Sequence, residues 1–120
     1  MSKSAKTPAM SEQELRLAAN QYTNELKLVA QKIGELESEL SEHDLVIDTM
    51  SKVDKERKCF RLVNGVLIER TVKEVLPALK TNEEGIKSTI KQLTEQYKAK
   101  DREFAEFQKK HHIRVAPASS

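Results

Sequence analysis

Two stripes of mostly apolar residues, one in each half of the chain, face each other in a single antiparallel register. Each stripe recurs in steps of four and three, the first over residues 15–50 and the second over residues 79–111. The register places Tyr22 opposite Phe107 and needs no residue inserted in either stripe. Heptads sustained over this length are typical of coiled coils, so we predict an all-α-dominated fold built on a long antiparallel two-helix coiled coil. The stripe positions are Leu15, Ala19, Tyr22, Leu26, Val29, Ile33, Leu36, Leu40, His43, Ile47 and Met50, then Leu79, Glu83, Ile86, Ile90, Leu93, Tyr97, Lys100, Phe104, Phe107 and His111.

A β-hairpin is predicted between the two stripes. Two short apolar runs flank an Asn64-Gly65 pair within residues 58–71. A two-residue type I′ turn needs a positive φ at both central positions, and asparagine and glycine tolerate this conformation best. With this turn, Val63 pairs with Val66, and the pairing continues outward to Phe60 opposite Glu69. The bend of the helical hairpin is therefore itself a hairpin of strands.

Both faces of this predicted hairpin are largely apolar near the turn. A hairpin with one face in water would alternate apolar and polar side chains, and this one does not. A two-stranded hairpin alone is marginal in water, and its edges leave N–H and C=O groups unpaired. We therefore expect the hairpin to join a larger sheet or β-barrel made with other chains, and an isolated chain to self-associate through it. The candidate assembly residues are Cys59, Phe60, Leu62, Val63, Asn64, Gly65, Val66, Leu67 and Ile68.

Local signals set the expected boundaries. Ser11 with Glu14, and Thr71 with Glu74, fit capping boxes at helix starts. Pro77 predicts a kink, or a short turn and a restart of the second helix. The expected organisation is a disordered tail over 1–10, one domain over 11–115 with a helix over about 11–57, a hairpin over about 58–71 and a helix over about 71–114, and a second tail over 116–120.

Composition argues against several classes of function. The net charge is only +2, which favours neither nucleic acid nor an anionic membrane as a partner. No apolar run approaches the roughly 18 residues that span a bilayer. A single cysteine and no Asn-x-Ser/Thr sequon favour a reducing compartment. We expect a cytoplasmic location, with the nucleus left open as a second one.

An enzyme is the least expected class. Nucleotide-binding glycine motifs, C-x-x-C and H-E-x-x-H are all missing from the sequence. Asp44 and Asp48 fall on a solvated helix face with no pocket to raise a pKa. Two polar stripe positions, His43 and Lys100, are interpreted as tolerated layers of the coil, with the Lys100 ammonium reaching out to water. A pH switch at His43 is the less favoured alternative. We predict no catalytic residues, no cofactor and no metal site.

The two runs over residues 42–50 and 58–77 also carry a family resemblance. The first reads Glu-His-Asp-Leu-Val-Ile-Asp-Thr-Met, and the second contains the hairpin and ends at Pro77. They resemble the β-type prefoldin subunit family, in which each subunit has one hairpin between two helical arms. The resemblance implies a heterohexameric co-chaperone of α-type and β-type subunits, with the hairpins in a β-barrel. It also implies ATP-independent capture of unfolded actin and tubulin and their transfer to the cytosolic chaperonin.

If the hairpin is the assembly end, the far ends of the coil are the client-binding tips. Leu17 lies off the stripe, and Ile113 and Val115 lie where the coil should fray, so these three favour a binding role. The other tip residues are open to an alternative interpretation as ordinary layers of the coil. The candidate client-binding residues are Leu15, Leu17, Tyr22, Leu26, Phe104, Phe107, Ile113 and Val115.

A different class of function competes with the chaperone hypothesis. Heptads fit equally well a coiled-coil adaptor or scaffold subunit without chaperone activity. The apolar hairpin favours the chaperone, because an adaptor needs only a polar loop at its bend. A coiled coil bound to nucleic acid is disfavoured by charge, since residues 12–57 carry 11 acidic and 6 basic side chains.

Overall fold

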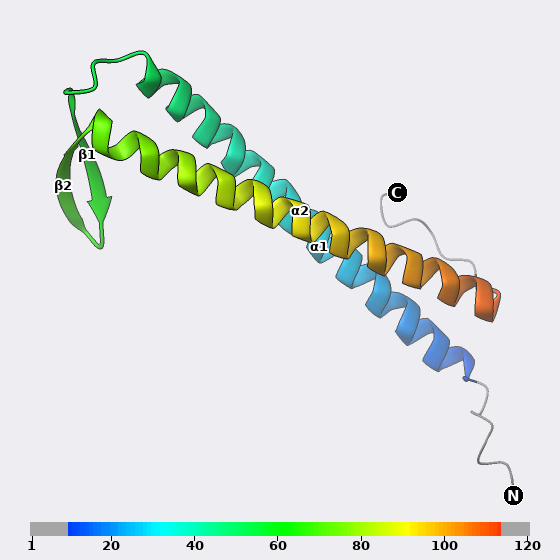
Figure 1. Cartoon of the computed structure of the whole chain (residues 1–120). Coiled ribbons are helices and arrows are strands. Elements are labelled where there is room, and N and C mark those ends of the chain that lie inside the picture. The colour runs from blue at the N-terminus through cyan, green and yellow to red at the C-terminus, as the bar shows by residue number, and fades with distance from the viewer. Residues whose placement is uncertain (1–9, 114–120) are drawn as a thin grey trace, which may run out of the picture. The chain divides into compact units, whose positions relative to one another are not determined.

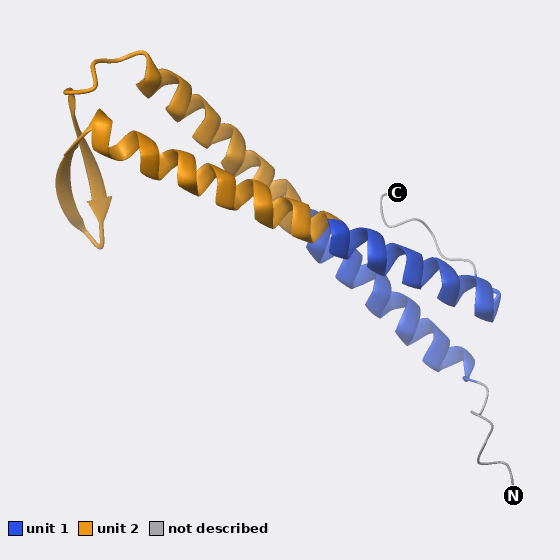
Figure 2. Cartoon of the chain, viewed as in Figure 1, with its two compact units in different colours: residues 1–31, 95–120 blue, residues 32–94 orange. Residues whose placement is uncertain are grey.

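Two long helices with an antiparallel β-hairpin between them make up the fold. The computed structural model describes residues 10–113 of the 120-residue chain. Helix α1 spans Glu12–Ser51, strand β1 Lys58–Val63, strand β2 Val66–Thr71 and helix α2 Val72–His111 (Figure 1). This order confirms the predicted class. The chain divides into two compact units, residues 1–31 with 95–120 and residues 32–94 (Figure 2), and each unit is described on its own.

The first unit packs α1 against α2 through a small aromatic core. Ala19, Leu26 and Phe104 are buried, and Tyr22, Tyr97 and Phe107 pack against them. The Tyr22 ring lies 5.1 Å from Phe104 and 5.3 Å from Phe107, measured between centroids. These contacts confirm the antiparallel register predicted for this part of the chain. Burying side chains of this size contributes about 1.5–3 kcal/mol each.

The second unit contains the other ends of both helices and the hairpin. Leu36, Val72 and Val75 are buried, and Leu79, Ile86 and the remaining stripe positions are half-buried. Along the whole described chain, every stripe position is buried or half-buried. The seam predicted from the sequence is therefore the seam that the helices use in each unit.

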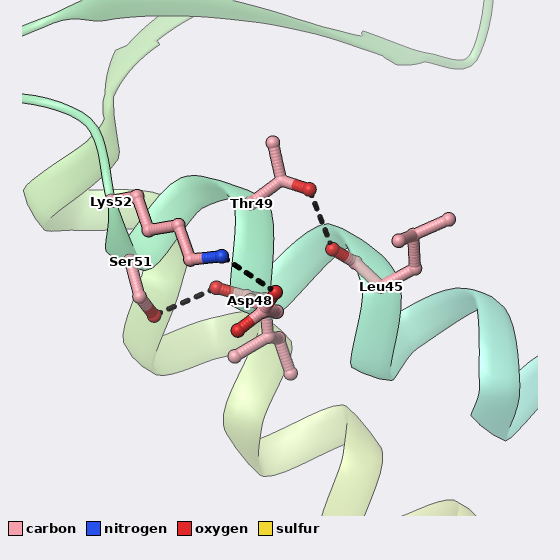
Figure 3. Close-up of polar contacts among 6 residues, drawn as sticks. Leu45, Asp48, Thr49, Ser51 and Lys52 are labelled. Atoms are coloured by element: carbon pink, nitrogen blue, oxygen red, sulfur yellow. Dashed lines mark hydrogen bonds and ion pairs between the residues drawn. The ribbon is translucent and has the colours of Figure 1, made fainter.

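Helix α1 ends at Ser51, so the expected helix end near Arg57 is wrong. The Thr49 hydroxyl donates to the Leu45 carbonyl at 2.8 Å, and the Ser51 hydroxyl donates to the Ile47 carbonyl at 2.7 Å (Figure 3). The same backward bond from a hydroxyl occurs inside continuing helix at Thr23, Thr81 and Thr89, so it does not by itself end α1. The Lys52 ammonium lies 3.3 Å from Asp48 beside them, and the chain then leaves the helix.

The loop over residues 52–57 has its own hydrogen bonds, and these explain why the helix stops. The Asp54 carboxylate accepts from the Glu56 N–H at 3.0 Å, which forms a local turn. The loop carbonyls of Lys55 and Arg57 accept from the Lys73 and Val72 N–H groups at 2.9 and 3.0 Å. The first N–H groups of a helix have no partner inside it. The loop supplies those partners for α2, which a continued α1 could not do.

Both predicted capping boxes are present. The Ser11 N–H donates to Glu14 at 2.8 Å and the Glu14 N–H donates to the Ser11 hydroxyl at 3.1 Å. Thr71 and Glu74 repeat the arrangement at 3.0 and 3.4 Å. The hydrogen bonds from Thr71 hold the pKa of the Glu74 carboxyl below its ordinary value. Helix α2 does not restart at Pro77, which lies inside the continuous helix after the buried turn at Val72 and Val75.

The C-terminal end of α2 is capped rather than frayed. His112 adopts a left-handed conformation with φ of 53°. The Ile113 N–H donates to the Gln108 carbonyl at 2.9 Å, and the His112 N–H donates to the Lys109 carbonyl at 3.4 Å. These two bonds define a Schellman motif. Ile113 is half-buried there, so the expectation that it lies in a fraying end is wrong.

Glu83 and Asp44 form a pair of carboxyl groups across the seam of the second unit. The hydrogen bond with Asp44 is the first cause of a raised pKa at Glu83, above its ordinary value of 4.5, and burial is the second. Glu84 raises this pKa further, whereas the Lys87 ammonium, 4.0 Å away, lowers it. Because folding raises the pKa, the folded chain binds this proton more tightly than the unfolded chain. Proton uptake by Glu83 therefore increases the free energy of unfolding as the pH falls toward 4.5.

We expect Glu83→Gln to raise the thermal midpoint at pH 7, because it removes one of two neighbouring negative charges and can donate to Asp44. The gain should shrink at pH 4.5, where the Glu83 carboxyl takes up its proton. Circular dichroism melts at both pH values measure this difference. Glu84→Gln is the matched control, since Glu84 contacts the same Lys87 at 3.6 Å but leaves 72% of its side chain exposed. An equal shift in both variants would contradict the role of the pair.

Candidate assembly and client-binding surfaces

The hairpin has the predicted turn and register. Asn64 and Gly65 have φ values of 51° and 80°, so both central residues use the left-handed region that a type I′ turn requires. Val63 pairs with Val66 and Leu62 with Leu67, and the ladder ends at Lys58 opposite Thr71. In the described chain the sheet has two strands only, so each strand has an unpaired edge.

One face of the hairpin is uncovered along its length. Leu62 and Leu67 face each other with 72% and 65% of their surfaces exposed, and Phe60 is exposed beside them. Across the strands from Phe60, Glu69 lies 3.9 Å from the Lys58 ammonium. Exposed apolar side chains that gather on one face in this way are typical of interaction surfaces.

The other face is partly covered. Cys59 is half-buried near the base of the hairpin and Ile68 is half-buried midway along β2, whereas Val63 and Val66 are exposed beside the turn. Cys59 is a free thiol. The nine predicted assembly residues thus lie together on one hairpin, and the uncovered apolar area is greatest near its turn. Contact with another chain at these residues stays a prediction.

The predicted client-binding residues differ in their exposure. Leu26 and Phe104 are buried in the core of the first unit, so they offer no surface to a client. Leu17 has 62% of its surface exposed. Val115 lies outside the described residues. Four others are half-buried, namely Leu15, Tyr22, Phe107 and Ile113. Client binding by any of these residues stays a prediction, and Leu17 is its best-placed member.

A polar cluster beside Tyr22 was missed by sequence reasoning. The Lys100 ammonium lies 3.1 Å from Glu25, 3.7 Å from Glu103 and 5.6 Å from the centre of the Tyr22 ring. The hydrogen bond with Glu25 raises the pKa of Lys100. Burial, followed by the Glu103 carboxylate, raises the pKa of the Tyr22 hydroxyl, which donates to Glu103 at 3.2 Å. The Lys100 ammonium therefore pairs with the Glu25 carboxylate, where the sequence predicted contact with water.

Further exposed apolar residues on α1 were not singled out from the sequence. Leu28 and Leu45 are each about two-thirds exposed, and Val46 is also exposed. The sequence could have indicated these exposed residues, because all three are apolar and lie at positions off the stripe. In the described residues no three metal-ligating side chains gather as a cation site would require. Neither described helix combines the length and the apolarity needed to cross a bilayer.

Comparison with known proteins identifies the family. Residues 13–118 match the family described as "Prefoldin subunit". Prefoldin subunit 2 of Homo sapiens is 51% identical over 107 residues, which cover 89% of this chain and 70% of that protein. Probable prefoldin subunit 2 of Schizosaccharomyces pombe is 46% identical over 104 residues, with coverage of 87% and 91%.

A solved structure shares the fold. The crystal structure of the prefoldin beta subunit from Thermococcus strain KS-1 aligns with a TM-score of 0.74 and covers 88% of this chain and 92% of that one. At 19% identity this likeness shows the fold alone. The sequence matches extend through both helices and the hairpin. The chain therefore belongs to the prefoldin subunit family.

Proposed function

We propose that this chain is a β-type subunit of a heterohexameric prefoldin, a cytoplasmic co-chaperone that binds unfolded proteins without ATP. Membership of the family makes it a subunit of a prefoldin chaperone complex that oligomerises with other prefoldin subunits. The finer proposal is that its hairpin joins a β-barrel with α-type and other β-type subunits. The complex would then hold unfolded actin and tubulin and transfer them to the cytosolic chaperonin.

The observation that carries this proposal is the uncovered hairpin face formed by Phe60, Leu62 and Leu67. Covering Leu62 and Leu67 would contribute about 1.5–3 kcal/mol for each side chain. Strands added to the free edges of β1 and β2 would satisfy backbone groups at the same time. The burial of the leucines and the pairing of the strand edges are both achieved only when other chains assemble on the hairpin. A polar loop between the two helices would offer neither contribution.

Client binding is proposed for exposed side chains of the first unit, with Leu17 first among them. One exposed leucine binds weakly by itself. Several subunits that each present such side chains to one unfolded chain would bind it by avidity. This arrangement requires binding surfaces only and no catalytic group, which agrees with a binding protein rather than an enzyme. An adaptor without chaperone activity would assemble equally well but would not need Leu17.

We expect Leu62→Ser with Leu67→Ser to remove this chain from the complex, because the apolar contact that drives assembly is lost. Two buried leucines correspond to a loss in affinity of roughly 100-fold to 10,000-fold. Native mass spectrometry of the chain co-expressed with α-type and other β-type prefoldin subunits measures the loss. Leu28→Ser with Leu45→Ser is the matched control, since these leucines are equally exposed but lie on α1. Full assembly of the hairpin variant would contradict the proposal.

We expect Leu17→Ser to weaken the capture of unfolded actin by the assembled complex without changing its subunit composition. Suppression of actin aggregation measures capture. Leu45→Ser serves as the control, because Leu45 is 67% exposed and Leu17 62% exposed on the same helix, whereas Leu45 lies in the second unit. Equal capture by the wild-type and Leu17→Ser complexes would argue for the adaptor function instead.

A further inference from the structure

A groove in the second unit lies where the end of α1, the following loop and the start of α2 meet. Its volume is about 530 Å³. Its apolar lining includes Met50, Val53 and Leu76, each of which is half-buried. Its polar lining includes three exposed lysines, Lys55, Lys73 and Lys80. The groove thus combines an apolar floor with positive charge contributed by the loop and by α2.

The three lysines of the groove make no ion pair within the described chain. No aspartate or glutamate lines the groove. Among residues 10–113, none of its three ammonium groups lies within 4.0 Å of a carboxylate. Two neighbouring lysines behave differently, since Lys52 pairs with Asp48 at 3.3 Å and Lys58 with Glu69 at 3.9 Å.

Backbone N–H groups at the start of α2 do not account for an anion site here. The Val72 and Lys73 N–H groups already donate to the loop carbonyls of Arg57 and Lys55. A small free anion would also leave the apolar floor exposed to water. The surface instead fits a peptide segment that presents apolar side chains on one side and carboxylates beside them. An amphipathic helix does this with apolar residues three and four apart.

We propose that this groove receives an acidic amphipathic segment of an adjoining prefoldin subunit. The location favours a subunit, because β2 ends at Thr71 and α2 begins at Val72, which itself lines the groove. A chain that pairs with the hairpin is therefore brought next to the groove. Apolar side chains of the partner cover Met50, Val53 and Leu76, and its carboxylates pair with the three lysines. This proposal rests on the assembly proposed above.

The test uses the complex of this chain with α-type and other β-type prefoldin subunits. The triple variant Lys55→Glu, Lys73→Glu, Lys80→Glu reverses the charge of the groove. The control Lys91→Glu, Lys98→Glu, Lys109→Glu makes the same change in net charge at three other exposed lysines of α2. Circular dichroism checks that both variants keep their helices. Subunit exchange followed by native mass spectrometry then gives the dissociation rate at low and at high salt.

We expect the groove variant to dissociate from the complex about tenfold faster than the control at low salt, because each exposed ion pair contributes a factor of about 1.5 to 5. The difference should shrink in high salt, which screens such pairs. Carbodiimide treatment of the wild-type complex should join at least one groove lysine to an aspartate or glutamate of another subunit.

Three results would overturn the proposal. The groove variant could dissociate at the control rate. The groove lysines could cross-link only to a second copy of this chain, or only to added unfolded actin. The hairpin variant with Leu62→Ser and Leu67→Ser tests the assembly proposal by itself, so failure of the groove proposal can be distinguished from failure of the assembly proposal. If the hairpin variant is excluded from the complex while the groove variant dissociates like its control, only the groove proposal fails.

Discussion

The uncovered apolar face of the hairpin is the constraint on which the functional account depends. Leu62 and Leu67 pair across the two strands, and nothing among residues 10–113 covers them. Helix packing does not share this problem, because in each unit the seam positions of α1 and α2 are buried or half-buried against each other. The helices can therefore satisfy their apolar stripes within one subunit, whereas the apolar face of the hairpin stays exposed to water in the single chain that the structure describes.

The loop before the hairpin determines the local structure beside the proposed assembly surface. Its carbonyls at Lys55 and Arg57 hold the first N–H groups of α2, and this fixes the loop beside the helix start. The same arrangement leaves the Lys55 and Lys73 side chains around an apolar floor next to β2. Backbone hydrogen bonding thus places a basic groove beside the strands, and both surfaces are available to one partner.

Sequence patterns predicted the parts of the fold that depend on short-range chemistry or on strict periodicity. The register of the hairpin follows from Asn64-Gly65, and the seams follow from the heptads. The end of α1 did not follow, because it depends on a loop whose carbonyls cap a helix that begins 15 or more residues later in the sequence. The cap at His112 was missed because a histidine occupies a position where glycine is usual.

Residues of the candidate sites could be located only in part from the pattern. In the sequence, apolar residues at helical spacing look alike whether they form a core or a binding surface. Only the structure distinguishes Phe104, which is buried, from Leu17, which is exposed. The most direct test of the central claim is hydroxyl-radical footprinting of Phe60, Leu62 and Leu67 in the isolated chain at low concentration and in the assembled complex. The account predicts strong protection of these side chains on assembly, with Leu28 labelled equally in both samples. Equal labelling of the hairpin in the two samples would contradict it.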